Sequence, residues 1–288
     1  MRAPFLLALC AVTFVATPLG AQSTDSPLNS ALVWRNVGPF RGGRISAASG
    51  AIGQPGVFYV GTPNGGVWKT TSAGETWYPI FDSIKSVSSI GAVEVAPSDP
   101  NVVYVGTGDL NSFFDGMGDG IYRSSDAGRT WRRIGLEGTQ QITSILVHPR
   151  DPNLLVVSAL GGFFQTQSDA RGVFRSTDGG ASWAKTLYLD DKTGIATLAH
   201  AADVPDVILA ATMYRSLTSG PGNPPPPNPD TAQTRSRLYK SADGGVTWRE
   251  IVGGGLPHLK GRVSLAVGVG TNAQRVYAIG DFGLYRSL

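Results

Sequence analysis

The sequence predicts an all-β fold assembled from repeated antiparallel units, and three observations support this prediction. One short phrase ending in tryptophan recurs four times along the chain. Glycine (38 residues) and proline (19 residues) are abundant while only 16% of residues are charged, a composition typical of short strands joined by tight turns. No segment places apolar residues at helical spacing over three turns.

The repeated phrase has the form Ser-x-Asp-x-Gly-x-Thr-Trp, with small variations. Its tryptophans are Trp77, Trp131, Trp183 and Trp248, which lie 54, 52 and 65 residues apart. Its acidic position is held by Ser72, Asp126, Asp178 and Asp243. A fifth copy begins at Leu284 and runs into the end of the chain.

Each copy of the phrase predicts a β-hairpin turn. The carboxylate can accept hydrogen bonds from backbone N–H groups about two residues further on, and the glycine can adopt a positive φ. The tryptophan then begins the outgoing strand and buries a large ring. We expect the turn at Ser72 to be the loosest, because a hydroxyl is a weaker acceptor than a carboxylate.

Three further strands repeat around each phrase, so that one unit contains four. An apolar first strand such as 90–100 is followed by a second, such as 102–105, and by a third that leads into the phrase. Four short strands in about 50 residues are typical of a β-propeller blade. The predicted propeller, 31–288, has about 4.5 to 5 blades. Their approximate ranges are 43–81, 88–136, 140–189, 194–253 and, incomplete, 262–288.

The first residues predict a cleavable signal peptide over 1–21, followed by a flexible segment over 22–30. Arg2 supplies a positive charge, 5–15 is an apolar run, and small residues precede a cut after Ala21. We therefore expect a secreted or periplasmic protein. The single cysteine, Cys10, lies inside the leader, so the mature chain would have no disulfide, thiolate nucleophile or zinc–thiolate site.

Net charge and hydropathy narrow the classes of partner that the sequence predicts. The net charge of +3 falls to +2 with the leader removed, which is too small to indicate nucleic acid or an anionic membrane. No later segment is long and apolar enough to predict a membrane span. The three histidines, His148, His200 and His258, fall in separate blades, so we expect neither a metal centre nor a cofactor.

The segment 32–37 is a candidate closing strand. Trp34 to Gly38 matches Trp131 to Gly135, which is the fourth strand of a blade, yet no blade precedes it. Two interpretations stay open: a five-bladed ring sealed by this strand, or the opening part of a larger propeller. We expect the larger propeller, because repeat arrays need intact ends to cover their cores.

These motifs resemble those of the Asp-box (BNR) repeat proteins, and in particular the bacterial sortilin-like, "glycosyl hydrolase BNR repeat" group. The resemblance rests on the four boxes and on the segments 38–45 and 61–70, and it covers nearly all of 31–288. It implies a β-propeller. The same box occurs in sialidases, xyloglucanases, sortilin-type receptors and photosystem assembly factors, so the resemblance does not identify a function.

Binding residues are expected in the upper loops, which join second to third strands on the face opposite the boxes. The box residues, which lie on the other face, would act only as turn braces. Blade one offers Asn64 in a short turn. Blade two offers carboxylates beside aromatic rings, a composition suited to sugars: Asp109, Asn111, Phe113, Phe114 and Asp115. The alternative is a Gly-Asp turn cluster.

A second candidate site is the mouth of the central tunnel. Arg41 and Arg44 precede the innermost strand of blade one, and Lys260 and Arg262 hold the matching place in blade five. Converging cations would attract an anionic ligand. The alternative is that they pair with carboxylates of adjacent blades.

The interpretation that follows is a binding or scaffold propeller for a peptide, protein or carbohydrate ligand, with its oligomeric state open. The alternative is a xyloglucanase- or sialidase-like glycoside hydrolase with part of its site beyond Leu288, for which Asp109, Asp115 and Asp281 would be candidate acid and base residues. The family's xyloglucanases carry a catalytic Asp two residues before a Gly-Gly pair, where this chain has Pro63. No catalytic residue is therefore assigned.

Overall fold

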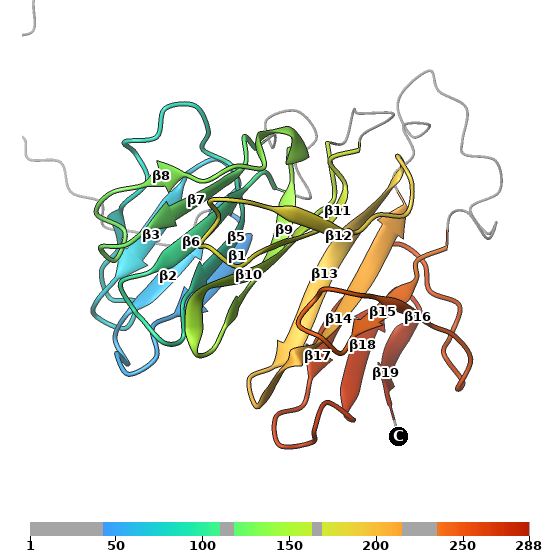
Figure 1. Ribbon diagram of the computed structural model, residues 1–288. Helices are drawn as coiled ribbons and strands as arrows, with labels where there is room; N and C mark the ends of the chain where they lie inside the picture. The colour runs from blue at the N-terminus through green and yellow to red at the C-terminus, as the bar shows by residue number, and fades with distance from the viewer. Residues whose placement is uncertain (1–42, 110–117, 163–168, 215–234, 288) are drawn as a thin grey trace, which may run out of the picture. The chain divides into compact units, whose positions relative to one another are not determined.

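The computed structural model describes residues 43–109, 118–162, 169–214 and 235–287 (Figure 1). The chain divides into two units, 1–42 and 43–288, and the described residues all belong to the second. Several predictions lie outside the described residues: the signal peptide 1–21, the segment 22–30, the closing strand 32–37, Arg41, Asn111, Phe113, Phe114 and Asp115.

The described residues form five antiparallel sheets, which follow one another along the chain. The first contains β1 (Ala47–Gly50), β2 (Phe58–Gly61), β3 (Val67–Thr70) and β4 (Tyr78–Pro79). The second contains β5 (Ile90–Val95), β6 (Val103–Thr107), β7 (Ile121–Ser124) and β8 (Arg132–Arg133). The third contains β9 (Ile142–His148), β10 (Asp151–Ala159), β11 (Gly172–Ser176) and β12 (Ala184–Leu187).

The last two sheets repeat this pattern. The fourth contains β13 (Thr193–Ala201), β14 (Val204–Tyr214), β15 (Leu238–Ser241) and β16 (Arg249–Ile251). The fifth contains β17 (Ser264–Val267), β18 (Val276–Gly280) and β19 (Gly283–Arg286). The helical structure described is one 3₁₀ turn, η1 (Glu137–Thr139), which joins the second sheet to the third.

Strand order within every sheet follows chain order, so each sheet is a meander (Figure 1). The first strands of the sheets, β1, β5, β9, β13 and β17, contact one another in succession. This is the arrangement of propeller blades, and the predicted fold class is confirmed.

The apolar core lies between successive sheets. Tyr59 and Val67 of the first sheet pack with Val93, Val103 and Val105 of the second, and similar clusters join each later pair. Because a middle sheet is covered on both faces, a central strand can be buried along its whole length, as in β6, where every residue is buried. Each fully buried Val or Ile side chain contributes about 1.5–3 kcal/mol.

The Asp-box turns differ in one detail from the prediction. Asp126 accepts the backbone N–H of Thr130 at 2.9 Å and its hydroxyl at 2.6 Å, so the carboxylate reaches four residues on, not two. It also accepts the Ser124 hydroxyl at 2.7 Å, while Ala127 and Gly128 both take positive φ. The longer reach follows from these two consecutive left-handed residues. Asp178 and Asp243 make the same bonds.

These bonds lower the pKa of the box carboxylates. For Asp126 the Thr130 hydroxyl is the largest cause, followed by the Thr130 backbone N–H, and the pKa is about 2. The pKa of Asp178 is also about 2, with Ser182 in the same roles. Asp243 shifts in the same direction.

The first box was expected to be the loosest, and its hydrogen-bond lengths do not show this. The Ser72 hydroxyl accepts the backbone N–H of Thr76 at 2.9 Å, the same length as the matching bond to Asp126. The Thr76 hydroxyl also lies 2.9 Å from Ser72 Oγ. A hydroxyl therefore replaces the carboxylate without opening the turn.

The tryptophans of the boxes join neighbouring sheets. Trp131 Nε1 donates to the carbonyl of Ile80 at 2.7 Å, and Trp183 Nε1 donates to that of Ile134 at 2.8 Å, each in the preceding sheet. Trp77 instead donates to Gly74 in its own turn and stays 36% exposed. The expectation that each ring is buried holds only in part: Trp131, Trp183 and Trp248 are half-buried. Trp77 is exposed, because no sheet precedes the first among the described residues.

Candidate functional site

The two ends of the sheets can be told apart by strand register. Ala47 at the start of β1 pairs with Gly61 at the end of β2, and Ile90 pairs with Thr107 in the same way. We call this the pocket end. The boxes lie at the other end, since Phe58 at the start of β2 pairs with Thr70 at the start of a box. We call that the box end.

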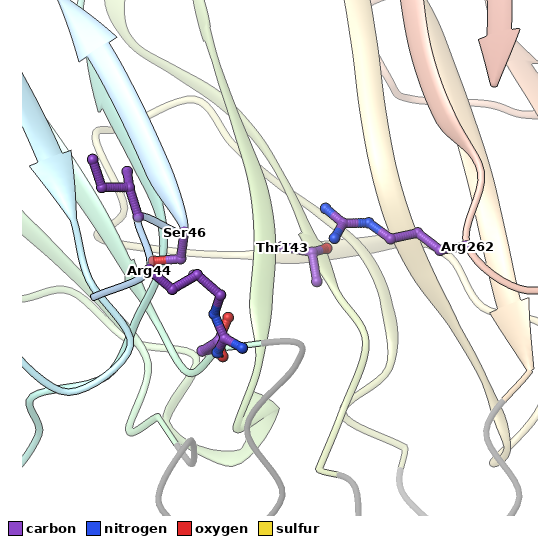
Figure 2. A pocket seen from close by; sticks show the side chains of 7 residues that line it. Arg44, Ser46, Thr143 and Arg262 are labelled. Atoms are coloured by element: carbon purple, nitrogen blue, oxygen red, sulfur yellow. The ribbon is translucent and has the colours of Figure 1, made fainter. Parts of the chain in front are cut away.

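A pocket of about 250 Å³ lies at the pocket end, where the first strands begin. We call it the inner-strand pocket, and its side chains are drawn in Figure 2. It is lined by Arg44, Ile45, Ser46, Gly91, Asp109, Thr143 and Arg262. The predicted candidates Arg44, Asp109 and Arg262 are therefore brought together from three different sheets.

Asp109 is held by buried polar groups far away in the sequence. Its backbone N–H donates to the Ser89 hydroxyl at 3.0 Å, and its carbonyl accepts the Gln141 side-chain amide at 3.0 Å. Asp109 is 2% exposed, and its two partners are each 1% exposed. The preceding Gly108 has φ +90°, and a Cβ there would clash with the backbone oxygen of Gln140. The backbone of Asp109 is thus fixed by tertiary contacts.

The connector around η1, near Asp109, holds two residues in strained backbone conformations. Leu136 (φ 60°) and Gln140 (φ 54°) flank η1 in the left-handed region, where a residue with a Cβ costs about 1–2 kcal/mol. Gln140 also accepts the backbone N–H of Gly118 at 2.6 Å. Such strain persists only where the surroundings enforce it, and it is common beneath binding sites.

Arg44 forms an ion pair with Asp109 across the first and second sheets. The side chain of Asp109 is 3% exposed and that of Arg44 is 46% exposed. The pairing with a carboxylate of an adjacent blade, one of the two sequence alternatives, is therefore present. It also lies in the pocket wall, so the arginine and the carboxylate present one joint surface to the pocket.

Arg262 lies two residues before β17 and reaches the pocket from the side opposite Arg44, with its guanidinium directed toward Thr143 (Figure 2). It is exposed, and within the described ranges no carboxylate lies within ion-pair distance of it. Asp281, in the β18–β19 turn, comes near: its Oδ2 would lie 3.5 Å from a Cβ on Gly261. Asp281 is exposed and does not line the pocket.

Other lining residues were missed by sequence reasoning. Ser46, Gly91 and Thr143 each follow an isoleucine at or just before the start of an inner strand, so aligning the repeats at that isoleucine would have found them. The Ser46 hydroxyl donates to the carbonyl of Ile90, and Thr143 donates to that of Ile195 at 2.8 Å, each in the next sheet. These hydroxyls bridge the sheets around the pocket.

The remaining candidates lie elsewhere. Asn64 is exposed in the turn between β2 and β3 and does not line the pocket. His200 lies toward the box end. Its pKa is lowered, mainly by burial and to a smaller extent by the charge of His148. Within the described ranges no group of three or more metal-binding side chains occurs, and no helix there has the length and apolar character to cross a membrane.

Comparison with known proteins adds a family and several relatives. The family model of sortilin, neurotensin receptor 3, matches residues 65–213. A xyloglucanase of Paenibacillus sp is 28% identical over 290 residues, covering 89% of this chain and 26% of the relative. Xyloglucanase Xgh74A of Acetivibrio thermocellus is 26% identical over 253 residues, covering 76% and 28%. The chain thus spans about a quarter of the length of these relatives.

Solved structures support the fold. The GH74 enzyme of Niastella koreensis superposes with a TM-score of 0.60 at 18% identity, covering 84% of this chain and 36% of that one. The extracellular domain of a putative one-component system, BT4673 from B. thetaiotaomicron, has a TM-score of 0.55 at 12% identity, covering 88% and 28%. At these identities the comparison speaks for the β-propeller alone.

Proposed function

We infer, from the premise that this chain belongs to the Sortilin-Vps10 family, that it is a glycoside-hydrolase-like β-propeller that binds a polysaccharide. The saccharide would be held at the inner-strand pocket, outside the cytoplasm. The names of the xyloglucanase relatives support a carbohydrate ligand. The leader-like pattern at 1–21 supports the location.

One observation carries the proposal: Asp109 presents a carboxylate in a pocket wall while its backbone is anchored by buried groups. Saccharide sites need acceptors held in fixed positions, because sugar hydroxyls are recognised by directional hydrogen bonds. Arg44 orients the carboxylate from one side and leaves its other lone pairs for a sugar hydroxyl. Asp109 is therefore the residue that would contact the saccharide.

Hydrolysis of a glycosidic bond is a second candidate function. It needs two carboxyl groups that flank the bond. Asp109 and Asp281 both lie at the pocket end, in the second and fifth sheets, which favours this candidate. Pro63 at the position of a catalytic aspartate weighs against it. Binding is thus proposed first and hydrolysis second.

The test measures retention of the full chain on immobilised polysaccharides, both neutral and acidic, with xyloglucan among them. Asp109→Asn should abolish retention, because it removes the charge that pairs with Arg44 and accepts the sugar hydroxyl. Asp99→Asn is a matched control, since Asp99 braces a turn at the box end and an asparagine keeps its acceptor oxygen. Equal retention of Asp109→Asn, or no retention of any polysaccharide, would refute the proposal.

The second candidate has its own measurement. Release of reducing ends from any retained polysaccharide reports hydrolysis, and Asp281→Asn should abolish that release while leaving retention intact. Unchanged release would remove Asp281 from consideration.

A further inference from the structure

The charges that line the inner-strand pocket are not balanced. Two guanidinium groups, Arg44 and Arg262, face one carboxylate, Asp109, which is already paired with Arg44. Arg262 has no carboxylate at ion-pair distance in the part of the chain that the structure describes. A guanidinium carries five N–H donors in a planar fork that matches a carboxylate. The pocket is therefore complementary to an anion.

The hydrogen-bond donors of the wall lead to the same conclusion. The hydroxyls of Ser46 and Thr143 already donate to carbonyls of the next sheet. A hydroxyl has a single O–H, so neither could donate to a ligand without breaking its bridge. Gly91 has no side chain, and a Cβ there would clash with the carbonyl oxygens of Gly108 and Ile142. The side-chain donors left for a ligand belong to the arginines.

Two features bear on the size of the ligand and on competition for Arg262. About 250 Å³ is below the roughly 300–1,000 Å³ of pockets that enclose a drug-sized molecule, so the pocket suits one sugar ring of a longer chain. Asp281, whose Oδ2 would lie 3.5 Å from a Cβ on the neighbouring Gly261, is exposed to water, where charge interactions are weak.

We propose that the inner-strand pocket binds a uronic acid residue of an acidic polysaccharide, with the sugar carboxylate against Arg262 and a hydroxyl of the same ring donating to Asp109. This inference rests on the proposed function and narrows its substrate class from polysaccharides in general to acidic ones. Arg262 is then the residue that selects an acidic ligand, and Asp109 is the residue that orients the ring.

The experiment compares three oligosaccharide probes by titration calorimetry with the full chain: a trimer of galacturonic acid, the same trimer with its carboxyl groups reduced to alcohols, and a neutral xyloglucan oligosaccharide. The acidic trimer should bind at least tenfold more tightly than its reduced form. That preference should shrink as salt is raised, because the pocket is open to solvent.

Variants assign the effect to Arg262. Arg262→Gln should remove the preference for the acidic trimer, and Arg262→Lys should restore part of it, because a lysine keeps the charge without the fork. Arg249→Gln, an exposed arginine on β16, is the matched control and should change nothing. Asp281→Asn should bind the acidic trimer equally or more tightly, since it removes a nearby negative charge.

The outcomes separate this inference from the proposed function. Equal affinity for the acidic and reduced trimers, or an unchanged preference in Arg262→Gln, overturns the inference. Binding of the neutral oligosaccharide through Asp109 without the acidic one overturns the inference and leaves the proposed function standing. If no saccharide binds, both fail. A peptide with a free C-terminal carboxylate that displaces the acidic trimer would assign Arg262 to peptides and overturn the inference.

Discussion

The two ends of the sheets use aspartate in opposite ways. At the box end, Asp126 is satisfied by groups two and four residues away, in its own turn. At the pocket end, Asp109 is held by Ser89, Gln141 and Arg44, which are 20, 32 and 65 residues away. A local brace repeats in sheet after sheet, because each turn supplies all of its partners. Asp109 is held by partners from three sheets, and this arrangement occurs once among the described residues.

The largest effect on stability is expected at Gly108, a position at the pocket end with no room for a side chain. Gly108→Ala places a Cβ against Gln140 at a positive φ, and should lower the free energy of unfolding by about 3 kcal/mol or more. Gly253→Ala is the matched control, because Gly253 also has positive φ but nothing lies near its Cβ. It should cost about 1–2 kcal/mol. Urea denaturation of both variants measures the difference, and equal losses would show that Gly108 is required for its φ alone.

The next largest effect is expected at Gln141, where a substitution separates the positioning of Asp109 from the stability of the fold. Gln141→Leu leaves the buried carbonyl of Asp109 without this donor, and should cost about 1–3 kcal/mol. Because Asp109 would lose its position, retention on the polysaccharide should also fall. Measured together, unfolding and retention give a clear result: a stability loss with full retention would mean that Gln141 is a core residue and does not position Asp109.

The smallest effect belongs to the box end and depends on pH. Hydrogen bonds hold the pKa of Asp126 and Asp178 at about 2, against an ordinary value of 3.8. A lowered folded-state pKa contributes stability above the unfolded pKa, which is lost as pH falls from about 4 to about 2. Urea midpoints over this range should fall less in a variant with asparagine at 126, 178 and 243.

A different acid, Glu94, provides an internal check on that titration. Burial raises the pKa of Glu94 on β5 to about 7. Its effect therefore has the opposite sign: stability present below the ordinary pKa is lost as pH rises toward 7. Glu94→Gln should flatten the profile on the neutral side and leave the acid side unchanged. A change below pH 4 in that variant would contradict the assignment of the acid limb to the box carboxylates.

The box turns and the strands around them could be predicted from the sequence because their determinants are local. The recurrence of Trp131, Trp183 and Trp248, with a serine, an aspartate and a glycine at fixed distances before each, specifies one turn and one unit after another. Even here, the reach of the carboxylate was underestimated. Two successive left-handed residues extend the turn, and only the backbone geometry reveals that extension.

The all-β class, the four-stranded unit and the boxes could be read from the sequence, since periodic patterns and turn residues act over a few neighbours. The sequence also named Arg44, Asp109 and Arg262 as candidates, from their residue type and loop position. The pairing of Arg44 with Asp109, and the anchoring of Asp109 by Ser89 and Gln141, became visible only in the packed structure. The physical reason is distance along the chain: these contacts exist only after separate sheets have packed together, and no local pattern encodes them.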